Sequence, residues 1–189
     1  KPFIVAAGMS VLLSGRTGGA TGVDPITRWS VEATSGAAAV GMAPFRTPIT
    51  LALVHVAMYD AVNAVTLAHK PYAVSVDVKR PALAEAAAIA AGYHLLLAEL
   101  PARQPALEQT YRELLSTLPD SEVRRNGLLA GEAVARELLA LRANDGRNLV
   151  LSHTPGSGLG GWQPTPPGFL AATSAFLSRV TPFTMDSPK

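Results

Sequence analysis

Four polar residues that could do chemistry lie in an otherwise apolar stretch, residues 48–68. His55, Tyr59 and Asn63 follow one another at intervals of four residues, and Asp60 precedes Asn63 by three. On a helix these intervals bring side chains together. A catalytic or metal-binding His/Asp pair is one interpretation, although two ligands on one helix ordinarily stand four residues apart. His55 and Asp60 are five apart. We therefore favour a structural network in which each buried polar group is hydrogen-bonded.

The other candidates for chemistry are isolated. His94 stands in an apolar segment, where a histidine is more often a core or boundary residue than a ligand. His69 and His153 have no obvious partner nearby in sequence. The glycine-rich run 156–161 lacks the strand and the Gly-Lys-Ser/Thr ending of a phosphate loop. The sequence thus predicts a scaffold, with no catalytic, cofactor-binding or metal-binding residue in this chain.

Helices are the elements expected to position these residues. Asp24 followed by Pro25 is typical of a helix start, and Thr47-Pro48 repeats the device. Apolar residues recur with the helical period from Ile89 to Leu100. We predict an all-α fold, a helical bundle of about five helices followed by a Pro/Gly-rich extended arm. The helices are expected from residue 24 and over 48–68, 81–100, 105–118 and 120–144, with 48–68 as the central helix.

Three parts of the chain are distinguished by composition. Residues 1–22 join a Lys and a short apolar stretch to a run of small residues, which indicates a signal-like or disordered segment and an extracytoplasmic or secreted protein. Residues 23–146 carry the helical patterns. Residues 147–189 are rich in Pro and Gly, and from 153 to 183 they contain one charged residue, Arg179. This arm is expected to pack on a missing C-terminal half.

Composition excludes several classes of function. Of the 189 residues, 48% are apolar and 16% charged, with a net charge of +2, which argues against disorder. No basic run exceeds two residues, so no nucleic-acid partner is expected. The absence of Cys excludes a thiolate nucleophile and Cys-ligated metals. The apolar stretch 3–13 is too short to span a bilayer, and we predict no transmembrane helix.

The segment from His55 to Ala64, His-Val-Ala-Met-Tyr-Asp-Ala-Val-Asn-Ala, resembles the signature helix of bacterial vanadium-dependent haloperoxidase-like proteins, in the type 2 phosphatidic acid phosphatase superfamily. Residues 24–29, 71–72, 162–167 and 180–183 resemble further landmarks in the same order. The resemblance covers about 24–189 and only the N-terminal half of the family. It implies that a complete member binds vanadate and uses hydrogen peroxide to oxidise halide.

The family's anion ligands reside in its other half, and their motifs do not recur here. Arg80-Pro81 is preceded seven positions earlier by Ala73 where the family has Lys. Ser152-His153 lacks the intervening Gly, and Arg179 is followed five positions later by Thr184 where the family has His. The resemblance therefore assigns no cofactor to this chain, although vanadate is expected in a complete member.

Three functional hypotheses remain open at this point. The first is the N-terminal helical half of a haloperoxidase-like enzyme, inactive by itself. The second is part of an acid-phosphatase-type relative that hydrolyses phosphate esters at the same anion site. The third is a non-catalytic helical scaffold or interaction module. The expected partner is the missing C-terminal half or a second copy in a homo-oligomer, because an exposed apolar arm favours association.

Overall fold

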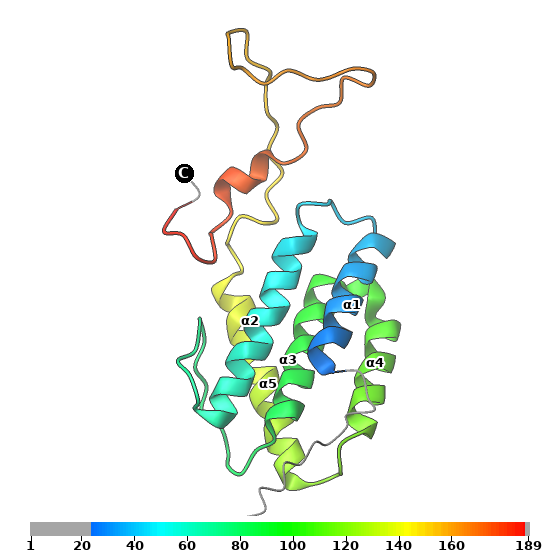
Figure 1. The fold of residues 1–189 in the computed structure, drawn as a ribbon, viewed down its shortest axis with the longest axis vertical. Coiled ribbons are helices and arrows are strands. Elements are labelled where there is room, and N and C mark those ends of the chain that lie inside the picture. Colours follow the sequence, from blue (N-terminus) through cyan, green and yellow to red (C-terminus); the bar gives the residue numbers. More distant parts are fainter. Residues whose placement is uncertain (1–23, 188–189) are drawn as a thin grey trace, which may run out of the picture.

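The fold is an all-α bundle, as predicted. The computed structural model describes residues 24–187, and no strand occurs within that range. Its five α-helices are α1 (Pro25–Ala39), α2 (Thr47–Thr66), α3 (Ala84–Glu99), α4 (Gln104–Ser116) and α5 (Glu122–Leu141), with short 3-10 helices at Pro101–Arg103 (η1) and Ala175–Arg179 (η2). Figure 1 shows the helices side by side and the arm projecting beyond one end of the bundle.

Capping side chains fix two helix starts. The Asp24 carboxylate accepts the Thr27 backbone N–H at 2.9 Å, which confirms the start predicted from Asp24-Pro25. The Ser121 hydroxyl accepts the Arg124 N–H at 3.1 Å at the head of α5. By contrast, α2 begins at the predicted Thr47-Pro48 without any side-chain cap, so the proline and tertiary packing define that start.

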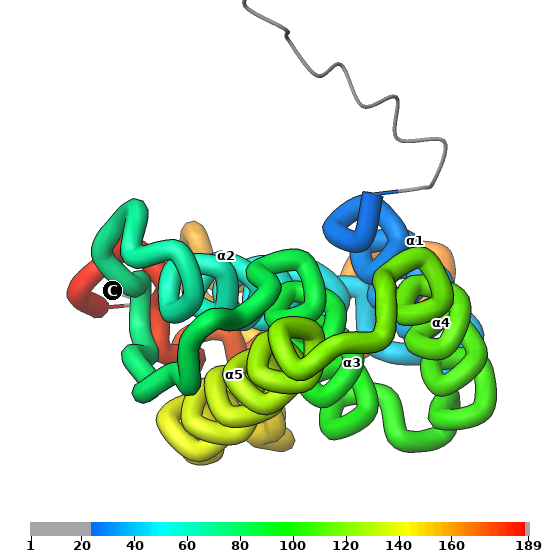
Figure 2. The backbone as a smooth tube through the Cα atoms, turned by 90° about the horizontal axis from the view of Figure 1, so that it is seen from below, coloured from blue at the N-terminus to red at the C-terminus, as the bar shows by residue number. Residues whose placement is uncertain are grey.

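The helix with the most neighbours is α3, and not the 48–68 helix that hydropathy predicted as central. α3 packs against all four other helices, whereas α2 packs against α1, α3 and α5. The end-on view in Figure 2 shows α3 between α4 and α5. Close approach explains this position, because a Cβ on Gly131 of α5 would lie 2.1 Å from the Ala87 carbonyl oxygen of α3.

Two helix boundaries differ from the prediction by three residues, and both differences have tertiary causes. α3 begins at Ala84 and not near residue 81. Leu83 N–H donates to the Val123 carbonyl at 3.0 Å, and the Asn126 amide donates to the Pro81 carbonyl at 2.9 Å, so α5 holds residues 81–83 outside the helix. α5 ends at Leu141, short of residue 144, because the following residues turn back in a cluster of ion pairs.

The arm leaves α5, extends away from the bundle and returns to it. Nearly every residue from 148 to 171 is exposed, whereas Phe176 and Val180, in and directly after η2, are buried. The signal-like segment predicted for residues 1–22 lies outside the described residues.

By length and composition alone, α2 is one helix in the described range that could cross a membrane. Over half of its most apolar window, 56%, is buried inside the bundle. Core helices of soluble proteins pass the same test, so this observation is weak evidence for a membrane span. The expectation of no transmembrane helix therefore stays a prediction.

Candidate functional site

Asp60 of α2 holds the segment that follows this helix. The residue is completely buried, with 0% of its surface exposed. Its carboxylate accepts three backbone N–H groups, from Tyr72 at 2.6 Å, Ala73 at 2.9 Å and Val74 at 2.8 Å. Charged acceptors make stronger hydrogen bonds than neutral ones. All the described donors to this carboxylate are backbone amides, so Asp60 serves to shape the chain after α2.

Tyr59 and Asn63 bind the same segment from either side of Asp60. The Asn63 side chain donates to the Tyr59 carbonyl at 3.0 Å and accepts the His69 N–H at 3.2 Å. The Tyr59 hydroxyl donates to the Lys70 carbonyl at 3.2 Å. Three of the four predicted network residues thus converge on residues 69–74. Their hydrogen bonds run to backbone atoms, which is the pattern expected of a structural role.

His55 lies apart from the other three residues. Its Nε2 atom is 3.0 Å from the Ser30 hydroxyl of α1, and its side chain is exposed. It lines a shallow apolar hollow of about 380 Å³ together with Val56, Tyr59 and Tyr72. The hydrogen bond between His55 and Ser30 links α2 to α1 at the surface. Within residues 24–187, no carboxylate hydrogen-bonds to the His55 ring.

A buried charge network joins α3 to the chain after α5. Arg147 donates to Glu99 at 2.8 Å and lies 2.9 Å from an oxygen of Asp145. The side chains of Arg147 and Glu99 are each only 6% exposed. The second Asp145 oxygen accepts the Arg142 Nε at 3.0 Å. The two arginines and two carboxylates therefore neutralise one another in the interior.

Electrostatics keep Arg147 charged despite its burial. Burial alone would lower the pKa of Arg147, but the hydrogen bond and charge of Glu99, with the charge of Asp145, raise the pKa above its ordinary range. The Thr50 hydroxyl donates to the other Glu99 oxygen at 3.4 Å, which brings α2 into the network. This cluster supports the fold where three elements meet.

Neither buried arginine in the described part of the chain is free to bind an oxyanion such as vanadate, and Arg80 and His153 are also engaged with protein groups. The guanidiniums of Arg142 and Arg147 are already occupied by carboxylates and carbonyls. Arg80 donates to the carbonyls of Ala64, at 2.9 Å, and Val65, and so covers the end of α2. The imidazole of His153 lies edge-on to Trp162 on the exposed arm. Within residues 24–187, no group of three His, Cys, Asp or Glu side chains could hold a metal ion.

Sequence reasoning missed the Glu99, Asp145 and Arg147 network. These residues belong to segments almost fifty positions apart, so no local spacing connects them. One signal was present: the polar run Asn144-Asp145-Gly146-Arg147-Asn148 follows the apolar pattern of α5 directly. A charged run at the end of a core helix is ordinarily solvated, so this run does not by itself predict a buried network.

We expect His94 to make the stability of the protein depend on pH. Burial lowers the pKa of His94 below its ordinary value of 6.5, and the charge of Glu132 partly opposes that shift. The unfolded chain therefore takes up this proton first, and stability falls as the pH drops below about 6.5. We expect His94→Gln to lose less stability than the parent between about pH 8 and about pH 5.5 in urea unfolding. An equal loss in both proteins would contradict this assignment.

No protein-family model, curated protein or solved structure matches the chain.

Proposed function

We propose that this chain is the N-terminal helical scaffold of a vanadium-dependent haloperoxidase-like enzyme. The observation that carries the proposal is the role of the family-like motif in α2, from His55 to Ala64: Tyr59, Asp60 and Asn63 all hold the backbone of residues 69–74. These hydrogen bonds support a structural role for the motif. The anion-binding residues would then be supplied by a second half.

The arm supports the same proposal. Between residues 148 and 178 the sequence contains no Asp, Glu, Lys or Arg. Val150, Leu159, Phe169 and Leu170 are exposed along it. An exposed apolar surface of this kind indicates a site of association. In the proposed enzyme the C-terminal half would cover this arm, and vanadate would supply halide-oxidising chemistry when bound to that half.

Two other functions remain as candidates. An acid-phosphatase-type relative would use the same scaffold beside a phosphate-binding half, and the exposed arm is equally compatible with it. A non-catalytic scaffold or interaction module is favoured by a different observation: both buried arginines of the described range are bound to carboxylates of the chain itself.

The DNA downstream of the codon for Lys189 tests the proposal. We expect the reading frame, or an adjacent one, to encode a Lys followed after six residues by Arg-Pro, then Ser-Gly-His, then an Arg with a His five residues further on. The phosphatase-type relative is distinguished from the peroxidase by assay of the joined protein. A stop codon with no neighbouring frame that encodes these motifs would overturn both enzymatic candidates.

A further inference from the structure

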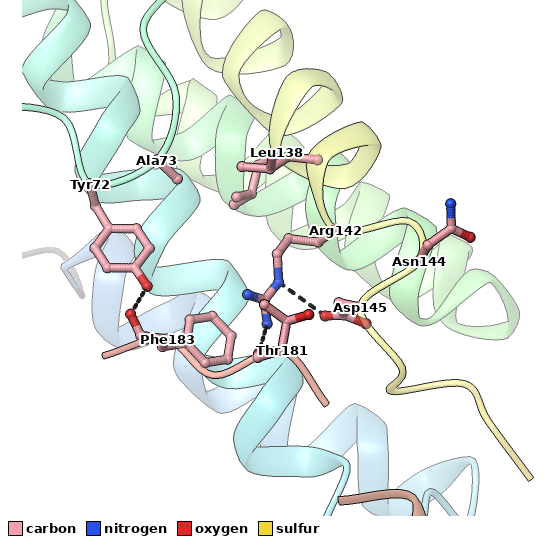
Figure 3. A pocket seen from close by; sticks show the side chains of 9 residues that line it. Tyr72, Ala73, Leu138, Arg142, Asn144, Asp145, Thr181 and Phe183 are labelled. Atoms are coloured by element: carbon pink, nitrogen blue, oxygen red, sulfur yellow. Dashed lines mark hydrogen bonds and ion pairs between the residues drawn. The ribbon is translucent and has the colours of Figure 1, made fainter. Parts of the chain in front are cut away.

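The arm returns to the bundle at one well-built junction. Thr181 N–H donates to the Asp145 carbonyl at 2.7 Å. Arg142 donates to the carbonyls of Thr181, at 2.7 Å, and Pro182, at 3.3 Å. Its guanidinium carbon also lies 4.3 Å from the centre of the Phe183 ring, a cation–π distance. Figure 3 shows the Arg142 side chain between Asp145 and this returning segment.

Arg142 is aimed at the arm by a partner on its own side. The Asp145 carboxylate accepts a hydrogen bond from the Arg142 Nε–H. Both terminal nitrogens of Arg142 are therefore left to donate to the carbonyls of the arm. The side chains of Arg142 and Asp145 are 9% and 2% exposed. A planar guanidinium with several donors suits such multiple recognition of oxygens.

The turn at Gly146 completes the junction. Its φ of +88° favours glycine, and a Cβ there would lie 2.2 Å from the Arg179 carbonyl oxygen. The Tyr72 hydroxyl, from the segment held by Asp60, donates to the Phe183 carbonyl. The beginning of the arm, beside Gly146, therefore lies in contact with its end, residues 179–183. Residues 148–171 between them make little contact with the bundle.

We propose that Arg142 is a latch that closes residues 148–180 into a loop, and that releasing it loosens the attachment of the arm, which then depends on the buried Phe176 and Val180, while the five helices stay folded. Thr181 and Phe183 form part of the wall of a cavity of about 460 Å³, whose other walls include Ala73 and Leu138. Unlatching removes Thr181 and Phe183 from the wall of this cavity. The released arm would stay attached to α5 but change its position relative to the helices. Arg142 therefore determines whether the exposed apolar residues of the arm hold one fixed position relative to the bundle.

A distance measurement between the bundle and the arm tests the latch. Because the chain contains no cysteine, Glu137→Cys on α5 and Ser178→Cys in η2 provide two spin-label positions. We expect one narrow distance distribution in the otherwise unchanged protein and a broad one in Arg142→Gln. Far-UV circular dichroism should show the same helix content in both.

A second variant keeps the test decisive if Arg142→Gln does not fold. Phe183→Ala removes the ring under the guanidinium from the arm itself, and we expect it to broaden the distribution as well. Phe169→Ala is the matched control, because that phenylalanine is exposed on the same arm and its removal should leave the distribution narrow. A narrow distribution in folded Arg142→Gln would overturn the latch, and so would a narrow one in Phe183→Ala or a broad one in the parent.

Discussion

Replacement of Arg147 by methionine is expected to lower the free energy of unfolding by about 3–5 kcal/mol. The substitution leaves the Glu99 carboxylate buried without its cation, and Asp145 keeps only its ion pair with Arg142. Removing one partner of a buried ion pair is costly because the remaining charge has lost both water and its counter-ion. Urea unfolding followed by circular dichroism measures the loss.

Arg136→Met is the matched control for that experiment. Arg136 also belongs to this part of the chain, but its side chain is 65% exposed and its nearest acidic oxygen, on Glu137, is 3.8 Å away. Exposed ion pairs contribute little because water and salt screen them. We expect unchanged stability in this variant. If the Arg147 and Arg136 variants were equally stable, the buried network would not support the fold as described.

Asp60→Ala is the second variant with a large expected effect, a loss of about 3 kcal/mol or more. Three backbone N–H groups lose a charged acceptor, and the N–H of Val74 is buried, where water cannot readily replace the carboxylate. Hydrogen exchange of the amides of residues 72–74 should accelerate at the same time, which locates the damage in the segment after α2.

Asp77→Ala provides the comparison for Asp60. Asp77 lies on the same connection between α2 and α3, but its side chain is exposed. We expect a change in the free energy of unfolding within about 0.5 kcal/mol and unaltered exchange at residues 72–74. If Asp60→Ala behaved like Asp77→Ala, the proposed structural role of the α2 motif would be wrong.

Local sequence signals predicted where the helices lie. Long-range contacts, which a single sequence does not show, determined the start of α3 and the place of each helix in the bundle. The Asp24 cap, the Thr47-Pro48 start and the apolar period of α3 each act within a few residues, so their helices were predictable. The start of α3 depends on Val123 and Asn126, which lie some forty residues away from the atoms they bind. α3, which is as apolar as α2, packs against more helices, and the glycines of α5 permit its close approach, so the prediction of α2 as the central helix was wrong.

The candidate site shows the same division. Spacing grouped Tyr59, Asp60 and Asn63, and in the structure all three hydrogen-bond to the backbone of residues 69–74. It also included His55, whose partner Ser30 on α1 could not be inferred from intervals within α2. The Glu99–Arg147 pair and the Arg142 junction bring together segments 39 to 48 residues apart, for which a single sequence carries no pairing signal.

Bromide oxidation is the most direct measurement of the central claim that this chain is a scaffold whose anion site lies in another half. Residues 1–189 are assayed with hydrogen peroxide and added vanadate, by themselves and joined to the downstream half. We predict no turnover by residues 1–189 and vanadate-dependent turnover by the joined protein. Vanadate-dependent turnover by residues 1–189 alone would contradict the account, because it would require an anion site among residues assigned here to structure.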